Sequence, residues 1–430
     1  MRWLLLLALK GALLAQTYSS IIEEVDNSPL LQSAKELKMA ASSAAEAARG
    51  KSMPSLDVSF GAAWLKERPT VTFRIPGYPP MDAPMGTKRN FNGSVRLAYP
   101  LFTGFAISAE IEKMGYESET ARLKLLDLKR NLYLQATELA AACFAADKTL
   151  EAQIEAKKAM EDAYRKAKGL YDNGLLPPAD LYNIEAKQYE VEAEIEETKT
   201  KRAQILNRLG YLINAKVESV DLPLYLFSLN MEKEALIEEA LESREDIKVL
   251  KTVLKSGDTV IKLAESRLYP SVTLAAELKR RGDTPKLNGD GFTNPDQSYI
   301  GASLSWNLFN GFSDKKMIES ARYRRLASAA MLNDYKMRVK TELENAFLDL
   351  SALYSRLKSA KMELKARGAY CELTKGRFEN QLADADELSR SIAELFASKA
   401  KVAVLQSRIF KQKASILLMA GIDPFKRVVE

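Results

Sequence analysis

The 430-residue chain has no histidine and only two cysteines, Cys143 and Cys371. Without histidine, His-dependent catalytic triads, imidazole acid–base catalysis and most zinc sites are excluded. Carboxylates alone can still perform acid–base chemistry, but the 57 Asp and Glu residues fall mostly in long charged helical patterns, where they usually face solvent. We therefore expect no enzyme, no metal site and no cofactor.

Long apolar runs and concentrated basic clusters are also missing. After the N-terminus, no stretch approaches the roughly 18 consecutive apolar residues of a membrane-spanning helix. The formal net charge is only +6, so nucleic acid is not an expected partner. The N-terminus itself, MRWLLLLALKGALLAQ, combines an early Arg2 with an apolar stretch and predicts a secretory signal peptide over 1–15. A short buried helix is the alternative.

A repeated sequence motif shows how the rest of the chain is organised. YPLFTGF at 99–105 returns as WNLFNGF at 306–312, and YDNGLLPPADLY at 171–182 returns as FENQLADADELS at 378–389. Both pairs are 207 positions apart, which indicates an internal duplication. We expect the following segments: repeat 1 at 16–213, an irregular connection at 214–231, repeat 2 at 232–421 and a C-terminal tail at 422–430.

Four short stretches alternate apolar and polar residues. In the first, Leu56, Val58 and Phe60 alternate with Asp57 and Ser59. A period of two predicts strands with one apolar face, and each stretch is long enough for a tilted membrane strand of about 9–11 residues. A soluble sheet packed on a core is the alternative. The predicted strands lie near 54–66, 92–102, 270–280 and 299–309, with turn-rich loops at 67–90 and 283–297.

Between these stretches the apolar residues follow a helical period. Steps of three and four predict a coiled-coil helix along Leu343, Ala346, Leu350, Leu353, Leu357, Ala360 and Leu364. The pattern over 106–168 has no proline and predicts a helix roughly 95 Å long. Within the repeat frame, Cys143 and Cys371 are offset by 21 positions, or roughly 30 Å along parallel helices, so we expect no disulfide between them.

Four strands cannot close a barrel, because about eight are needed before the interior accommodates even side chains. Unpaired strand edges are not tolerated in lipid. If the strands lie in a membrane, several copies of the chain must therefore combine them into a closed ring. Two chains would give eight strands and three would give twelve, and the strand count does not choose between them.

The duplicated motifs are similar to those of a known family. A strand ending in Leu-Phe-x-Gly at 101–104 and 308–311 leads into a long helix, followed by Gly-Leu at 174–175 and a helical Asp-Leu at 180–181. This order resembles the TolC-like outer-membrane efflux proteins. The resemblance implies a mixed α/β, mainly α-helical fold. In it, a coiled-coil helical barrel continues a transmembrane β-barrel with four strands per chain and twelve in a homotrimer.

The resemblance also implies partners and a location. Such channels lie in the outer membrane of Gram-negative cells, contact its lipid and extend into the periplasm. They work with a periplasmic adaptor and an inner-membrane pump as the exit duct of multidrug efflux or type I secretion systems. A soluble periplasmic coiled-coil scaffold without transport activity is the alternative, which leaves the signal and the alternating strands unexplained.

By the same resemblance, the breaks between helices meet the adaptor at the periplasmic end. We expect the adaptor-binding tips to include Gly174, Leu175, Leu176, Asp180, Gln381 and Leu382. Merely closing a helical hairpin is the alternative role for each. The strand-to-helix junctions are expected at Gly104 and Gly311, where glycine lets the backbone turn. This sequence departs from the family pattern at Phe105, Phe312 and Gln381, which replace glycines.

The second break adds a group of acids, Asp384, Asp386 and Glu387. They either cap a helix N-terminus or form acidic rings that narrow the periplasmic mouth and favour cations. In the family, an acidic pair three residues apart forms the constriction. Glu387 matches its first member, and Arg390 stands in place of the second. We therefore expect a periplasmic gate of Asp384, Asp386, Glu387 and Arg390, with a Glu387–Arg390 ion pair.

Overall fold

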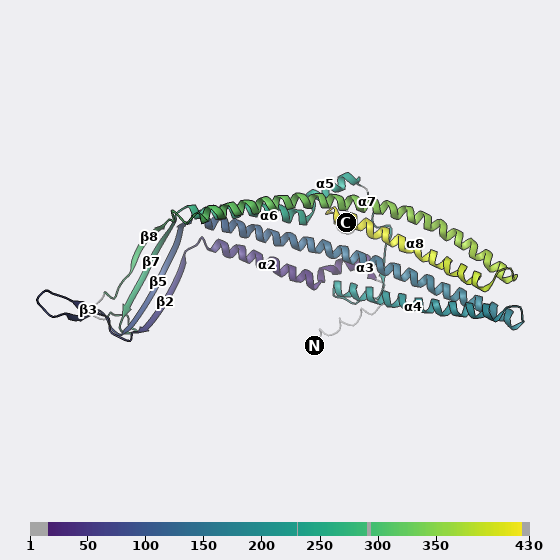
Figure 1. The fold of residues 1–430 in the computed structure, drawn as a ribbon, viewed down its shortest axis with the longest axis horizontal. Helices are drawn as coiled ribbons and strands as arrows, with labels where there is room; N and C mark the ends of the chain where they lie inside the picture. Colours follow the sequence, from purple (N-terminus) through teal and green to yellow (C-terminus); the bar gives the residue numbers. More distant parts are fainter. Residues whose placement is uncertain (1–15, 230, 290–293, 424–430) are drawn as a thin grey trace, which may run out of the picture. The chain divides into compact units, whose positions relative to one another are not determined.

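A computed structural model of the protein describes residues 16–229, 231–289 and 294–423 (Figure 1). The predicted signal peptide and the tail from 424 lie outside the described residues. The chain divides into two units. One comprises the residues up to Leu37, Arg122–Val249 and the residues from Leu332 on, and the other comprises Lys38–Ala121 and Leu250–Met331.

The second unit contains a four-stranded antiparallel sheet with the order β2-β5-β7-β8, so that β2 and β8 are its edges (Figure 1). The strands are β2 (Ser55–Trp64), β5 (Arg89–Phe102), β7 (Ser271–Gly282) and β8 (Tyr299–Ser305). β8 ends four residues before the predicted 309. Beyond it, the side-chain oxygen of Asn307 accepts a hydrogen bond from the backbone N–H of Phe309 (3.2 Å), an arrangement typical of a turn.

The strand register places the alternating apolar residues on one face. Leu56 lies opposite Leu97, Leu97 opposite Ala276, and Ala276 opposite Ile300. Paired residues point to the same side of a sheet, so all four strands share one apolar face. That face is exposed in the single chain, with Val58 at 77% and Ile300 at 89%.

The loop predicted at 67–90 contains a small hairpin that the sequence analysis missed. Strands β3 (Thr70–Phe73) and β4 (Met81–Pro84) pair in antiparallel fashion across the proline-rich turn. Proline density favoured an open loop, but the prolines lie in the turn and at a strand end, where no ladder hydrogen bond is lost.

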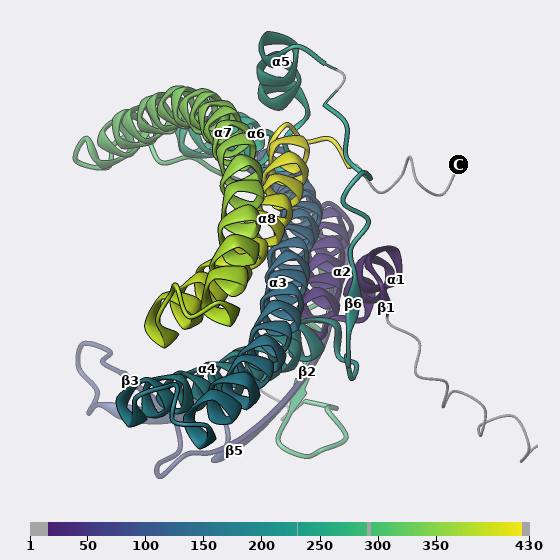
Figure 2. The same cartoon turned by 90° about the vertical axis from the view of Figure 1, so that its right-hand side faces the viewer.

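Long helices make up most of the chain. α3 (Ala106–Asp172) and α7 (Ser313–Glu379) have 67 residues each and begin 207 positions apart. α4 (Pro178–Ile213) and α8 (Ala385–Met419) follow them and close two helical hairpins (Figure 2). The remaining helices are α1 (Tyr18–Glu24), α2 (Pro29–Gly50), α5 (Lys233–Ser243) and α6 (Glu245–Glu265). Among the described helices, none is long and apolar enough to cross a membrane.

The first unit has two apolar clusters. One gathers around Tyr18, Phe227 and Phe410, whose rings meet at centroid distances of 4.8 to 6.0 Å. Beside it, β1 (Gln16–Thr17) pairs in parallel with β6 (Val220–Asp221). β6 lies inside the connection 214–231, which was predicted to be irregular. The other cluster, which we call the tip cluster, joins α3, α4, α7 and α8 near the turns of the two hairpins.

Both cysteines are buried free thiols, as the sequence predicts. Desolvation raises the pKa of Cys143 to about 12, with the nearby Asp147 carboxylate adding to the effect. Burial likewise raises the pKa of Cys371. Both residues pack in the helical clusters as small apolar side chains.

Candidate functional site

The turns of the two helical hairpins have the same backbone conformation. Gly174 has a φ of 73° and Gln381, 207 positions later, a φ of 59°, both in the left-handed region. In the first turn, the Leu175 N–H donates to the Leu170 carbonyl (2.9 Å). In the second, the Leu382 N–H donates to the Arg377 carbonyl (2.8 Å). The replacement of glycine by Gln381 therefore leaves the turn geometry unchanged.

The two turns have the same side-chain cap at the end of the preceding helix and different caps at the start of the following helix. Asn173 donates to the Gly169 carbonyl (2.6 Å), and Asn380 donates to the equivalent Gly376 carbonyl (2.8 Å). At the start of the next helix, however, the first turn has Pro177 without a side-chain cap, whereas Asp384 accepts the Glu387 N–H at 2.6 Å. The capping role of Asp384 is thus present in the structure.

The acids of the second turn pair with other partners than expected. Arg377 donates to Glu387 Oε1 (2.8 Å) and to the Leu382 carbonyl (3.0 Å), and the Tyr370 hydroxyl also donates to Glu387 (3.1 Å). Arg390 instead pairs with Asp386, one helical turn before it. The expected Glu387–Arg390 pair is wrong, because Arg390 binds Asp386 on its own helix and Glu387 binds Arg377 from α7.

The expected tip residues differ in exposure. Leu175 and Leu382 are 54% and 69% exposed, although an apolar cluster lies beside each turn. Leu176 instead packs against the tip cluster, and Asp180 is half-buried in the first turn of α4. Of the three leucines, two are therefore available to a partner and one stabilises the hairpin.

Two clefts of about 470 Å³ each flank the tip cluster. The first lies among α3, α4 and α8, and charged side chains of both signs line it, including Lys187, Glu190 and Glu194 with Asp386 and Arg390. The second lies among α3, α7 and α8. Two of the gate candidates thus lie on the wall of a cleft rather than at the turn.

The strand-to-helix junctions show why glycine occurs there. Gly104 and Gly311 have φ values of 60° and 54°, and the phenylalanines that follow, Phe105 and Phe312, are also left-handed at 70° and 63°. A Cβ on Gly104 would lie 2.4 Å from the Ser266 carbonyl oxygen, whereas a Cβ on Gly311 would meet nothing within 4 Å. Only at the first junction would a side chain clash with the neighbouring backbone.

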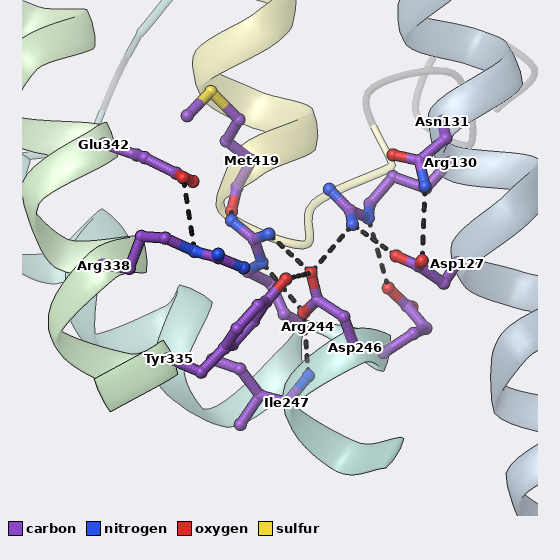
Figure 3. Close-up of polar contacts among 11 residues, drawn as sticks. Asp127, Arg130, Asn131, Arg244, Asp246, Ile247, Tyr335, Arg338, Glu342 and Met419 are labelled. Atoms are coloured by element: carbon purple, nitrogen blue, oxygen red, sulfur yellow. Dashed lines mark hydrogen bonds and ion pairs between the residues drawn. The ribbon is translucent and has the colours of Figure 1, made fainter. Parts of the chain in front are cut away.

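A buried charge network, which sequence reasoning missed, lies in the first unit at the α5–α6 junction (Figure 3). Asp246 accepts hydrogen bonds from Arg244 (2.5 and 3.1 Å), Arg130 (3.1 Å) and the Tyr335 hydroxyl (2.7 Å). Arg244 also donates to the Met419 carbonyl at the end of α8 (3.2 Å). The signal for it was weak, since Arg244 and Asp246 stand in a locally charged sequence like many others.

The ionisation of the network follows from its geometry. Burial alone would raise the pKa of Asp246, but the hydrogen bonds and charge of Arg244, together with Tyr335 and Arg130, hold it below its ordinary value. Burial and the neighbouring Asp246 raise the pKa of Tyr335. Asp246 therefore stays ionised and joins α3, α6 and α7 at one carboxylate, while Arg244 connects this network to the end of α8.

The family model described as outer membrane efflux protein matches residues 21–215 and 236–421. VceC from Vibrio cholerae is 18% identical, with a TM-score of 0.78 over 94% of this chain and 96% of that chain. CmeC from Campylobacter jejuni is 15% identical, with a TM-score of 0.73 over 96% and 88%. No curated protein sequence matches the chain.

The open state of the MtrE outer membrane channel from Neisseria gonorrhoeae is also similar. It is 14% identical, with a TM-score of 0.71 over 94% of this chain and 89% of that chain. The structural overlap with these channels establishes the fold, and the family model matches nearly the whole described chain in two successive ranges. The chain belongs to the outer membrane efflux protein family, as an outer-membrane channel that extends into the periplasm and provides an exit duct.

Proposed function

We propose that three copies of the chain assemble into one duct. The observation that carries this proposal is the sheet: its apolar face is exposed, and within the described chain the outer edges of β2 and β8 pair with no further strand. In lipid, each edge must pair with another strand. Pairing β8 of one copy with β2 of the next would close a ring of twelve strands, with lipid against the apolar face and water against the polar face.

We further propose that the segments 16–213 and 232–421 are the two duplicated units of each wall. The support lies in four left-handed positions, of which Gly104, Phe105 and Gly174 belong to the first segment and Asn214 directly follows it. Each has a left-handed equivalent 207 residues later, namely Gly311, Phe312, Gln381 and Gly421. Turns are set by local backbone geometry, so their matching spacing reflects duplicated helix lengths.

At the helical end, we propose contact with a periplasmic adaptor and, through it, an inner-membrane pump. The exposed Leu175 and Leu382 provide apolar contacts, and the cleft lined by Lys187, Asp386 and Arg390 provides complementary charges. Asp384, Asp386, Glu387 and Arg390 would act as the gate, opening when adaptor contacts favour separated hairpins.

The assembly is tested with a matched pair of substitutions on β2. Val58→Arg places a charge on the apolar face and Ser59→Arg places one on the polar face, at neighbouring positions. An arginine on a lipid face costs about 2–4 kcal/mol near the bilayer centre. Native mass measurement of detergent-extracted outer membranes should give a trimer for wild type and Ser59→Arg, with little or none for Val58→Arg. A monomer soluble in plain buffer would contradict the proposal and favour the scaffold alternative.

A further inference from the structure

Three successive cations, Lys279, Arg280 and Arg281, lie near the end of β7 that leads into the 283–297 loop, which we call the loop end of the sheet. Lys279 is opposite Ser94 and Arg281 is opposite Asn92. Both rows belong to the polar face, because they alternate with the apolar rows. Arg280 is opposite Gly93 and lies on the apolar face.

The two polar-face cations lack acidic neighbours in their rows. Ser94 pairs onward with Ser59, and Asn92 pairs with Gly61. Farther from the loop end, by contrast, Arg96 lies between the acids Asp57 and Glu277. Across the ranges that the structure describes, neither Lys279 nor Arg281 forms an ion pair with a carboxylate. Their charge is therefore not compensated within the sheet.

A cleft of about 450 Å³ opens beside Arg281 at the loop end. Asn90 and Asn92 share its lining with Arg281, and none of the lining residues is acidic. Gly61 makes room there, because a Cβ at this position would lie 2.2 Å from the side-chain oxygen of Asn92. The cleft thus combines a guanidinium group with two amide side chains, the donor groups that carboxylate, phosphate and sulfate oxygens bind.

We propose that Lys279, Arg281 and Asn92 form an anion-binding ring in the exit section of the duct, for solutes that carry carboxylate, phosphate or sulfate groups. The inference rests on the proposed function, since it requires the polar face to line the lumen. In a trimer, two cations per chain place six on one short section of the wall (2 × 3). Rings of charged side chains select ions of the opposite sign, and arginine binds oxyanions in a bidentate manner.

The acids Asp386 and Glu387 at the turn of α7 and α8 have arginine partners, whereas the cations at the loop end of the sheet have no carboxylate partner within the described residues. An anionic solute that has passed the gate would be drawn toward the exit, and the duct would conduct unequally in the two directions.

The test uses the full-length protein in planar bilayers, with pyrophosphate as the probe added to either side in turn. We compare wild type, the double variant Lys279→Gln/Arg281→Gln, and Arg280→Gln. The control removes the same kind of charge at the intervening position, on the opposite face. The double variant should shift the reversal potential in a KCl gradient toward cations and weaken pyrophosphate block about tenfold, the loss expected for charge-assisted hydrogen bonds. Arg280→Gln should do neither.

The outcomes distinguish a failure of the anion-binding ring from a failure of the proposed duct. A conducting double variant with unchanged reversal potential and unchanged block would overturn the anion ring while leaving the duct intact. An effect of Arg280→Gln as large as that of the double variant would overturn the assignment of the polar face to the lumen. Wild-type protein that inserts without conducting would remove the proposed duct itself.

Discussion

Gly174 and Gln381 stand 207 positions apart and have the same left-handed backbone, one as glycine and the other with a full side chain. Each closes a helical hairpin with an equivalent pair of backbone hydrogen bonds. A residue other than glycine costs about 1 kcal/mol in this region, since its Cβ crowds the backbone. The second tip therefore holds a small strain that the first does not.

Exchanging these residues gives the first prediction. Gln381→Gly should raise the free energy of unfolding by about 0.5–1 kcal/mol, and Gly174→Gln should lower it by about 1 kcal/mol. Thermal unfolding in detergent measures both. Nothing lies within 4 Å of a Cβ at Gly174, so a loss several-fold larger than this would mean that the side chain meets something beyond its own backbone.

The two strand-to-helix junctions give the second prediction. Gly104→Ala must place its Cβ against the Ser266 carbonyl, whereas Gly311→Ala meets open space. Both pay the left-handed penalty of about 1 kcal/mol, but only Gly104→Ala adds a backbone clash, with a total loss of about 3 kcal/mol or more. The yield of folded protein that resists heat in detergent should fall strongly for Gly104→Ala and little for Gly311→Ala. Equal losses would show that the difference in surroundings has no effect.

The third prediction concerns Arg377, which binds Glu387 and the Leu382 carbonyl. The equivalent residue of the first hairpin is Leu170, so Arg377→Leu copies a natural hairpin of this chain. Without this cation, the Glu387 carboxylate keeps only the Tyr370 hydroxyl and should raise the cation-to-anion permeability ratio about twofold, the change that ~0.5 kcal/mol gives. Reversal potentials measure it.

Arg377→Lys is the conservative control and should restore the wild-type ratio. Arg165→Leu removes an exposed cation that pairs with Asp162 on α3, and should leave the ratio unchanged. If Glu387→Ala and Arg390→Ala also leave conductance and cation preference as they are, these residues are not the gate.

The fourth prediction concerns the buried network at Asp246. Asp246→Ala leaves Arg244 and Arg130 buried without their shared partner and should cost about 3–5 kcal/mol. Tyr335→Phe removes a single hydrogen bond to the carboxylate and should cost about 1.5–3 kcal/mol. Denaturant titration compares the two. Similar losses for both would mean that the arginines find other partners.

The lowered pKa of Asp246 also predicts a pH dependence. Since the folded pKa lies below the unfolded value of about 3.9, the stabilisation is fully present above that value. It is lost as the pH falls through the folded pKa. Stability should therefore decline below about pH 4 in wild type, and Asp246→Asn should show a smaller decline over the same range.

The fifth prediction concerns the cysteines. With its pKa raised to about 12 by burial, Cys143 has almost no thiolate at pH 8, and it is also inaccessible. Folded protein should take up no alkylating reagent at Cys143 or Cys371, and denatured protein should take up one at each, as seen by mass measurement. Rapid labelling of the folded protein would show that the helical clusters open.

The sequence by itself determined the periodic features of this protein. Alternation with a period of two located the four strands of the main sheet, and steps of three and four located the long helices, because each local geometry repeats along the chain. The shared offset of 207 residues also predicted the positions of the two hairpin turns. Even the exception was local: the hydrogen bonds around Gln381 are those of Gly174, so the turn persists despite the lost glycine.

Only the tertiary structure decided which side chains meet. Glu387 pairs with Arg377 and not with Arg390, Asp246 binds Arg130 of α3 and Tyr335 of α7, and Lys279 lies beside serines rather than acids. A charged side chain has several partners within reach along its own helix, and each exposed pair is worth less than about 1 kcal/mol. Local preference is therefore too weak to choose, and the choice falls to the packing of segments that lie far apart in the sequence.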